Sequence, residues 1–456
     1  MLKPILWPVL IPSLLFAVGL GSILPVLVLG ALSLGATAAF AAAIVGVMGA
    51  VSLLATVPAG LLIDRLGDFR AMVVATLTAI VVLGAIVAAF VWESPASLVV
   101  YTVALMLFAP VSDVWNLARQ AVVAEVMPAA DLAKAMTALG GSMRVGNLLG
   151  PIIGAGLMLV FPLWSVFVFA GIAGLAAIGV MALPIARIPD YPGARVGGTG
   201  GGSTGKAQAH TAEAVAQEAN SAEAVAPTSD DLAVGVPSAP PRRARLDVRW
   251  GAVILVGISI MTLTIARSAQ PVVIQLWGVT IGLHESEISL LIAFGAGLEL
   301  VFMFLGAYIK DRLGRVATLV ACLTIFGSGF IVMVCAPSLI GMIVSVSIMA
   351  VGNGLGAGVN MTIGADLSPA VGRARFLGIW AIFSNGGKLA GPTLISLVIA
   401  IASLRFGVLF TGVFAIAGAL WVLVWAQRIG LPGRAAGRER RASRDDRRTA
   451  RSSMGG

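Results

Sequence analysis

Apolar residues dominate twelve long stretches of the chain, which fall into two sets of six. The first set lies near residues 6–31, 37–63, 71–92, 97–119, 135–160 and 163–187, and the second near 250–281, 285–309, 316–335, 337–361, 376–401 and 405–428. An α-helix needs about 20 apolar residues to cross a hydrocarbon core that is about 30 Å thick. The pattern therefore predicts an all-α membrane protein with twelve transmembrane helices in two six-helix halves.

Two segments lack this pattern. Residues 189–249 are rich in Gly, Ala, Ser and Pro, and residues 430–456 are rich in Arg. Segments with so few bulky apolar residues bury too little surface to offset the entropy cost of ordering. We predict a six-helix bundle at 1–188, a flexible cytoplasmic linker at 189–249, a second bundle at 250–429 and a disordered basic cytoplasmic tail at 430–456.

Charge gives the orientation of the helices in the membrane. Only 11% of the residues are charged, and the net charge is +9. Arg65, Arg70 and Arg312 lie in alternate connections, whereas the loops at 34–37 and 284–287 contain no Lys or Arg, and Arg405 is an exception. Basic residues accumulate in cytoplasmic loops. We therefore expect a multi-pass plasma-membrane protein with both termini cytoplasmic, and the positive charge requires no nucleic-acid partner.

Catalytic and cofactor patterns are missing from the sequence. There is no H-E-x-x-H pattern, and the glycine-rich stretch that ends at Lys206 is followed by Ala207, where a phosphate-binding loop needs Ser or Thr. Cys322 and Cys335 lie in or at the end of one apolar stretch, so they imply no disulfide framework. We expect no enzymatic activity, no metal and no cofactor.

The two halves are related by an internal repeat. Residues 124–151 and 365–392 align without a gap and share eight identities in 28 positions. The tetrapeptide DRLG also occurs twice, at 64–67 and 311–314, each time after an apolar stretch. Internal repeats of this size are typical of secondary transporters, in which two halves move around a central site.

The loop after the second stretch resembles a signature of the major facilitator superfamily, and so does its repeat. The matching residues are Gly60, Asp64, Arg65, Gly67 and Arg70 in the first half, and Asp311, Arg312, Gly314 and Arg315 in the second. Asp68 departs from the usual basic residue, and Ala307 replaces the first glycine of the second copy. The resemblance implies a cytoplasmic gate, in which the acid lies near a helix N-terminus or pairs with an arginine. The alternative is a polar turn that caps two helices.

A second resemblance is to the drug/proton exporters of this superfamily. It is carried by Gly146, Gly150, Pro151 and Gly154 in the fifth stretch and by Gly387, Gly391 and Pro392 in the eleventh. The segments at 265–283, 352–369 and 375–380 also resemble a group of exporters of actinobacterial character. Glycines at the spacing of the fifth and eleventh stretches also allow close helix packing, which is the alternative explanation. Such exporters place an arginine inside the fourth helix, whereas Arg119 is expected at or beyond its cytoplasmic end. The resemblance therefore does not by itself assign the proton-coupling residues of this chain.

Ionisable residues within the apolar stretches are costly unless paired, so they indicate function or structural ion pairs. We predict Glu299 and Asp113 as proton-coupling residues. The predicted substrate cavity consists of Arg144, Asn147, Arg267, Gln270, Asn360, Asn385 and Lys388. If the charges are only structural, the expected pairs are Glu299–Lys388 and Asp113–Arg144.

Together these features predict a monomeric secondary active transporter that exchanges protons for a small amphipathic molecule and exports it by alternating access. Its expected partners are the small-molecule substrate, protons and the lipid bilayer. The alternative is an importer or facilitator of a small metabolite, which includes anionic metabolites. A purely structural membrane protein would not need charged residues inside the membrane in both halves.

Overall fold

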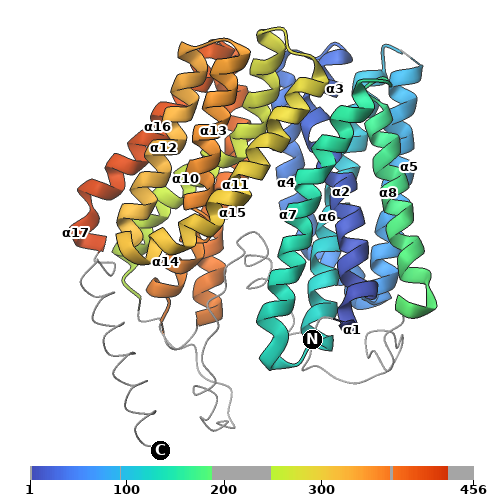
Figure 1. Cartoon of the computed structure of the whole chain (residues 1–456), viewed down its shortest axis with the longest axis horizontal. Helices are drawn as coiled ribbons and strands as arrows, with labels where there is room; N and C mark the ends of the chain where they lie inside the picture. Colours follow the sequence, from blue (N-terminus) through green and yellow to red (C-terminus); the bar gives the residue numbers. More distant parts are fainter. Residues whose placement is uncertain (1–2, 93, 187–247, 370–372, 430–456) are drawn as a thin grey trace, which may run out of the picture.

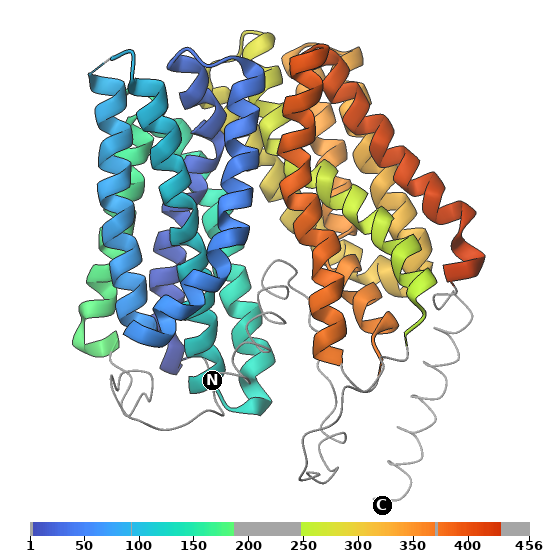
Figure 2. The same cartoon turned by 180° about the vertical axis from the view of Figure 1, so that it is seen from behind.

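The computed structural model of the chain describes residues 3–92, 94–186, 248–369 and 373–429 (Figure 1). Most of the predicted linker and the whole predicted tail lie outside these residues. The described part is helical, contains no strand, and forms two bundles side by side (Figures 1 and 2). The predicted fold class is thereby confirmed.

Each bundle contains six long helical segments within the described residues. In the first, one segment is built from α1 (Lys3–Ile5), η1 (Leu6–Leu10), α2 (Ile11–Ile23), η2 (Leu24–Val26) and α3 (Leu27–Ser33). It is followed by α4 (Ala38–Leu66), α5 (Asp68–Val91), α6 (Ser97–Val126), α7 (Ala129–Met158) and α8 (Ser165–Ala182), with a short η3 (Pro184–Ala186). The second has α10 (Trp250–Thr280), α11 (Glu285–Leu313), α12 (Arg315–Cys335), α13 (Leu339–Leu355) with α14 (Val359–Leu367), α15 (Arg373–Ile401), and α16 (Leu404–Val424) with α17 (Ala426–Ile429).

Ten of the described helical segments are long and apolar enough to cross a membrane by length and composition alone. The segments missing from this set are α7 and α15, which are equally long. They fall short in hydropathy because they carry polar residues such as Arg144 and Lys388. Helices α7 and α15 are therefore the least apolar of the membrane segments, and each carries a charged residue that we predicted to lie within the membrane.

The internal repeat extends to the backbone of the turns. Gly35 and Gly282 have φ values of 89° and 81°, and Gly67 and Gly314 have φ values of 78° and 83°. Positive φ is unfavourable for residues with a Cβ, so glycine is selected at each turn. Both pairs are 247 positions apart, the same separation as the two DRLG segments. The tetrapeptide recurs because the same tight turn between two helices recurs.

The bundles are in contact at the end opposite α1 and α17 and diverge toward the end where these two helices lie (Figures 1 and 2). We call these the joined end and the open end. At the joined end α15 packs on α4, where the Ser396 hydroxyl donates to the carbonyl of Ala39 at 2.7 Å. In the same way α11 packs on α7, where the Ser289 hydroxyl donates to the carbonyl of Pro151 at 2.8 Å.

Toward the open end the facing surfaces of these helices lose contact. A side chain at Gly46 of α4 would meet Thr393 of α15, but Val57 of α4 and Ile382 of α15 are 71% and 65% exposed. On the other side Val301 and Phe304 of α11 are also exposed. The two bundles thus form a V whose vertex lies within the membrane-spanning helices.

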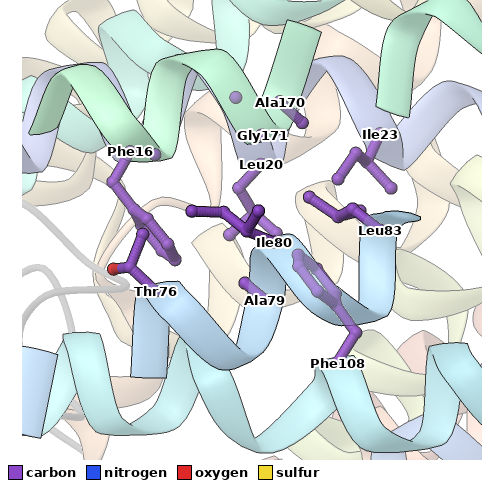
Figure 3. Close-up of a pocket in the computed structure, with 12 residues that line it drawn as sticks. Phe16, Leu20, Ile23, Thr76, Ala79, Ile80, Leu83, Phe108, Ala170 and Gly171 are labelled. Atoms are coloured by element: carbon purple, nitrogen blue, oxygen red, sulfur yellow. The ribbon is translucent and has the colours of Figure 1, made fainter. Parts of the chain in front are cut away.

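The first bundle also contains an apolar crevice among α2, α5, α6 and α8 (Figure 3). Its polar side chain, Thr76, donates to the carbonyl of Met72 and accepts from the indole of Trp115. Under the repeat, Ala79 and Leu83 of this crevice correspond to Phe326 and Phe330, which are fully buried in the second bundle. The crevice is a difference in packing between the halves, and it offers no polar group to a charged or polar substrate.

Candidate functional site

An ion pair joins the two halves at the vertex of the V. Arg144 Nη1 of α7 lies 3.9 Å from Glu299 Oε1 of α11, and the two side chains are 19% and 34% exposed. Beyond this pair, toward the open end, Gly141 of α7 has no neighbour near its Cβ position and α11 exposes apolar side chains. Arg144–Glu299 is therefore one of the last contacts between the halves before they diverge.

A second pair of opposite charges also involves both halves. Asp113 Oδ2 of α6 accepts a hydrogen bond of 2.6 Å from the Ser52 hydroxyl of α4. Lys388 of α15 interacts with Asp113 electrostatically without forming a direct ion pair, and Lys388 is exposed. In each of these two pairs the acid and the base come from different halves.

The expected pairs Glu299–Lys388 and Asp113–Arg144 are wrong for this conformation. Both were assigned within one half, but α7 packs on α11 and α15 packs on α4. Residues on α7 and α15 that point away from their own bundle therefore meet the opposite bundle. Sequence spacing within one half contains no information about this packing.

Neutral side chains of the second half complete the surroundings of Glu299. The amide of Asn353 on α13 donates to Glu299 Oε2 at 3.3 Å and to Gln270 Oε1 of α10 at 3.2 Å. Arg267, also on α10, donates to the main-chain carbonyl of Asn353 at 3.2 Å. Four predicted site residues, Glu299, Arg144, Gln270 and Arg267, are therefore brought together around Asn353.

A break in the tenth membrane segment explains the place of Arg267. Helix α13 ends at Leu355 and α14 begins at Val359, with Gly358 in the left-handed region at φ 74°. The corresponding helix of the first half, α6, is continuous. The break leaves carbonyl groups without helical partners, and Arg267 satisfies one of them. A Cβ at Gly356 would lie 2.5 Å from the Arg267 guanidinium, so a larger residue there would displace Arg267.

The remaining predicted cavity residues lie in different surroundings. The Asn360 amide donates to Ser384 and its oxygen accepts from the indole of Trp380, so it connects α14 to α15. Asn147 is half-buried on α7, and Asn385 is exposed on α15. Asn385 and Lys388 lie one turn apart on α15, and Leu389, next to Lys388, still lies near Gly49 of α4.

The structure describes the side chains of only some residues of the predicted cytoplasmic gate. Gly67 and Gly314 form the two equivalent turns, and Gly60 is half-buried. Asp64, Arg65 and Arg70 are exposed, and no ion pair of Asp64 is found in the described part of the chain. The side chains of Asp311 and Arg312 lie outside the described residues. In the second half Arg315 pairs with Asp366 at 3.0 Å, a partner that the sequence analysis did not identify.

If Asp64 acts as a gate, it does so in a conformation in which the open end closes. Asp64→Asn should change the free energy of unfolding by less than about 0.5 kcal/mol, because the side chain is exposed here. It should lower the yield of a disulfide between Val57→Cys and Ile382→Cys, in a background where Cys322 and Cys335 are serine. Asp131→Asn, a surface acid paired with Lys134, serves as the control. An unchanged crosslinking yield would leave Asp64 with a capping role only.

The glycines of the two export-type motifs are packing positions. A Cβ at Gly146 would lie 2.4 Å from Ala17 Cβ, and one at Gly150 would lie 2.5 Å from the Ser22 nitrogen, both on α2. In the second half Gly387 and Gly391 make the same approach to α10. Pro151 and Pro392 lie inside α7 and α15, and Gly154 packs loosely on Ser22. These glycines allow α7 to pack closely on α2 in the first bundle and α15 to pack closely on α10 in the second.

Arg119 lies deeper than expected. Helix α6 continues to Val126 rather than ending near residue 119, and Arg119 is 1% exposed. Its guanidinium contacts Asn116 and the sulfur of Met143, with no carboxylate within ion-pairing distance among the described residues. The helix of the fourth membrane segment therefore contains an arginine that is buried within the protein.

Gln275 joins the halves at the joined end. The first membrane segment is broken at η2, and the Gln275 amide of α10 satisfies both sides of this break. It donates to the carbonyl of Leu24 at 3.1 Å and accepts from the nitrogen of Val28 at 3.0 Å, and it is 1% exposed. This contact could not be predicted from local sequence, because 247 residues separate Gln275 from Val28.

Gln275→Leu should destabilise this conformation, because two buried main-chain groups would lose their partner at a cost of about 1–3 kcal/mol each. We expect a lower melting temperature and a longer distance between spin labels at Ser33 and Glu285, which are exposed at the joined end. Thr280→Val, which removes a hydrogen bond within α10, is the control. If both variants give the same label distances, Gln275 does not hold the joined end together.

The geometry agrees with comparisons to known proteins. Residues 6–266 and 253–453 match the profile of the Major Facilitator Superfamily. A comparison with curated proteins found no match. Among solved structures, a POT family transporter in complex with 5-aminolevulinic acid has a TM-score of 0.68 at 13% identity, covering 92% of this chain and 96% of that one. The human organic anion transporter MFSD10 (TETRAN) has a TM-score of 0.52 at 14% identity, covering 92% and 99%. Likeness at this identity shows the fold.

Proposed function

Because this chain belongs to the Major Facilitator Superfamily, we propose that it is a secondary active transporter whose substrate binds at the vertex between the two halves. The observation that carries the proposal is the ion pair Arg144–Glu299, which joins the halves where they diverge. A solute that binds there contacts both halves at once. Its binding energy can therefore favour one arrangement of the halves over the other.

The charges at the vertex favour a solute with a negative charge. Arg144, Arg267 and Lys388 supply three positive charges, and Glu299 and Asp113 supply two negative ones, which leaves an excess of one positive charge. An unbalanced charge at membrane depth is unfavourable unless a counter-charge is present. A small organic anion or zwitterion would supply it. The solutes named for two structural neighbours, 5-aminolevulinic acid and organic anions, are of this kind.

Glu299 and Asp113 are the proposed proton-coupling residues. Each is a carboxylate held between the halves, so each changes its surroundings when the halves move. Glu299 is the stronger candidate for proton coupling because its carboxylate pairs directly with Arg144 of the other half. Asp113 has a hydroxyl partner in its own half and a more distant cation.

The orientation of this conformation follows from the basic loops. The open end carries the connections in which Lys and Arg accumulate, which favours a cytoplasmic location for that end. In this proposal the structure is the state in which the substrate site communicates with the cytoplasm, in a plasma-membrane protein that works as a monomer.

Proton-driven efflux of a small amphipathic molecule is the second candidate. The buried Arg119 within the fourth membrane segment favours it, because exporters that the sequence resembles place an arginine there. The export-type glycines support it less, since close packing of α2 on α7 and of α10 on α15 explains them.

The test is transport in membrane vesicles of both orientations. Small carboxylates, amino acids and amphipathic cations are added in turn outside right-side-out and everted vesicles, and accumulation inside is followed with and without a proton uncoupler. The proposal expects uncoupler-sensitive accumulation of an anionic or zwitterionic solute in right-side-out vesicles. Accumulation of an amphipathic cation in everted vesicles only would favour the efflux candidate.

A further inference from the structure

We infer that Arg119 binds a small inorganic anion of the size of chloride in the core of the first bundle. The site lies among α2, α6 and α7, within one half and apart from the vertex between the halves. The inference goes beyond the proposed function, because it does not depend on which solute is transported or in which direction.

The charge of Arg119 has no counter-charge in the part of the chain that the structure describes. The side chain is buried, and a guanidinium keeps its proton in proteins. The two side chains that it contacts, Asn116 and Met143, are neutral, and Arg119 Nε has no hydrogen-bond partner. A buried charge without compensation is strongly unfavourable, and a bound anion removes this cost.

The second bundle has a neutral network at the equivalent place. The gapless alignment of the internal repeat, continued back along α6, places Arg119 opposite Asn360 and Met143 opposite Ser384. The contact is repeated as well, because the Asn360 amide donates to the Ser384 hydroxyl at 2.6 Å. The Asn360 oxygen accepts from the indole of Trp380. Protein groups alone therefore satisfy the neutral version of this site, whereas the charged version in the first bundle lacks an anion.

Further polar side chains occur near Arg119 where the second bundle has apolar ones. Gln120 of α6 and Ser13 of α2 are buried, and neither Gln120 Oε1 nor Ser13 Oγ has a hydrogen-bond partner among the described residues. The repeat places Met361 opposite Gln120. At the separation of the two DRLG segments, Ile260 corresponds to Ser13. The polar groups are thus particular to the half that carries the unpaired arginine.

Helix packing places Ser13 at the level of Arg119. Phe16 of α2 stacks on Trp115 of α6 with ring centroids 4.4 Å apart, and the two helices run in opposite directions (Figure 1). Ser13 and Arg119 therefore both lie about one turn from this stack, on its side toward the open end. Around α2, Ser13 lies between Phe16, which faces α6, and Ala17, which faces α7. The Ser13 hydroxyl is thereby directed to the space between α6 and α7, where Arg119 contacts α7.

The surroundings of Arg119 suit one small ion. The stacked rings lie on one side of it, and a buried apolar cluster of η1, α6 and α7 lies on the other. A larger organic anion would have to displace one of these. Met143 is unbranched and flexible, so it can turn away from the guanidinium and admit an ion. A water molecule can satisfy the Ser13 hydroxyl, but it cannot compensate the charge of Arg119.

The test is thermal unfolding of the full-length protein in detergent, in sodium chloride and in sodium gluconate of equal ionic strength. An ion that binds only the folded state should raise the melting temperature in proportion to the logarithm of the chloride concentration above its dissociation constant. Gluconate, a larger anion of the same charge, should give no such rise. Binding should also broaden the NMR signal of chloride, and bromide should reverse the broadening. Equal melting temperatures in both salts without line broadening would overturn the inference.

Variants of Arg119 make the test specific to this site. Arg119→Gln should abolish both the chloride-dependent rise and the line broadening. In gluconate it should melt at the same temperature as the unchanged protein or higher, because it no longer buries an uncompensated charge. If Arg119→Gln fails to fold, Arg119→Asn combined with Met143→Ser takes its place, since this variant copies the satisfied pair Asn360–Ser384 of the second bundle.

Cations elsewhere in the protein provide the controls. Lys388→Gln removes a positive charge at the vertex, and Lys134→Gln removes an exposed cation of α7. Both variants should keep the response to chloride. If Lys388→Gln abolishes the response and Arg119→Gln does not, chloride binds at the vertex and the inference is refuted. The readouts are stability and ion binding, so failure of the vesicle assay would refute the proposed function without affecting this result.

Discussion

Arg144→Gln is expected to lower the free energy of unfolding by about 1–3 kcal/mol, and adding Glu299→Gln should restore most of the loss. Breaking a fully buried ion pair costs about 3–5 kcal/mol because one charge is left uncompensated, and partial exposure of this pair reduces the cost. The double variant has no such charge. The free energies of unfolding of the two single variants and the double variant, measured in one detergent, give the coupling energy directly.

The same pair should dominate transport. Glu299→Gln is expected to remove the dependence of accumulation on the proton gradient while the substrate still binds, because a neutral amide keeps the size of the side chain. Asp113→Asn is the comparison, since Asp113 has a different partner. If Glu299→Gln responds to an uncoupler like the unchanged protein and Asp113→Asn does not, Asp113 is the coupling residue and Glu299 is structural.

The largest effect on folding is expected at Gly150. A Cβ there would lie 2.5 Å from the Ser22 nitrogen and 2.6 Å from the Val18 oxygen. These are main-chain atoms of α2, so α2 and α7 must separate. Gly150→Ala should therefore destabilise the protein by about 2–4 kcal/mol, in the range of severe overpacking.

Gly156, on the same helix, provides the matched control. No atom lies within 4 Å of its Cβ position, and the residue is exposed. Gly156→Ala should leave the stability unchanged or raise it by up to about 1 kcal/mol, because alanine favours the helix. Gly391→Ala should reproduce the Gly150 effect in the second half, where Ser268 and Ile265 of α10 are the neighbours. Similar melting temperatures for Gly150→Ala and Gly156→Ala would contradict the packing role of the motif.

The helices and their order can be predicted from the amino-acid sequence alone. Apolar stretches of membrane-spanning length have few stable arrangements other than helices, because main-chain groups in lipid must be satisfied within the segment. The internal repeat can also be predicted from the sequence, because the turns at Gly67 and Gly314 have the same tetrapeptide. Both turns need a glycine with positive φ. The helix boundaries are predicted less accurately. Helix α6 extends to Val126, and Arg119 is buried in the protein interior.

Which charges meet depends on how the helices of the two halves pack. Glu299 and Asp113 stood out in the sequence because charges are rare in apolar stretches, but their partners could not be deduced. Arg144 lies 155 positions from Glu299, and they meet because α7 of one half packs on α11 of the other. The same holds for Gln275 and the break at Leu24–Val26, where a side chain satisfies main-chain groups of the other half. Local sequence determines whether a segment crosses the membrane as a helix, whereas the partner of a charge depends on the surface that the helix meets after the halves have packed together.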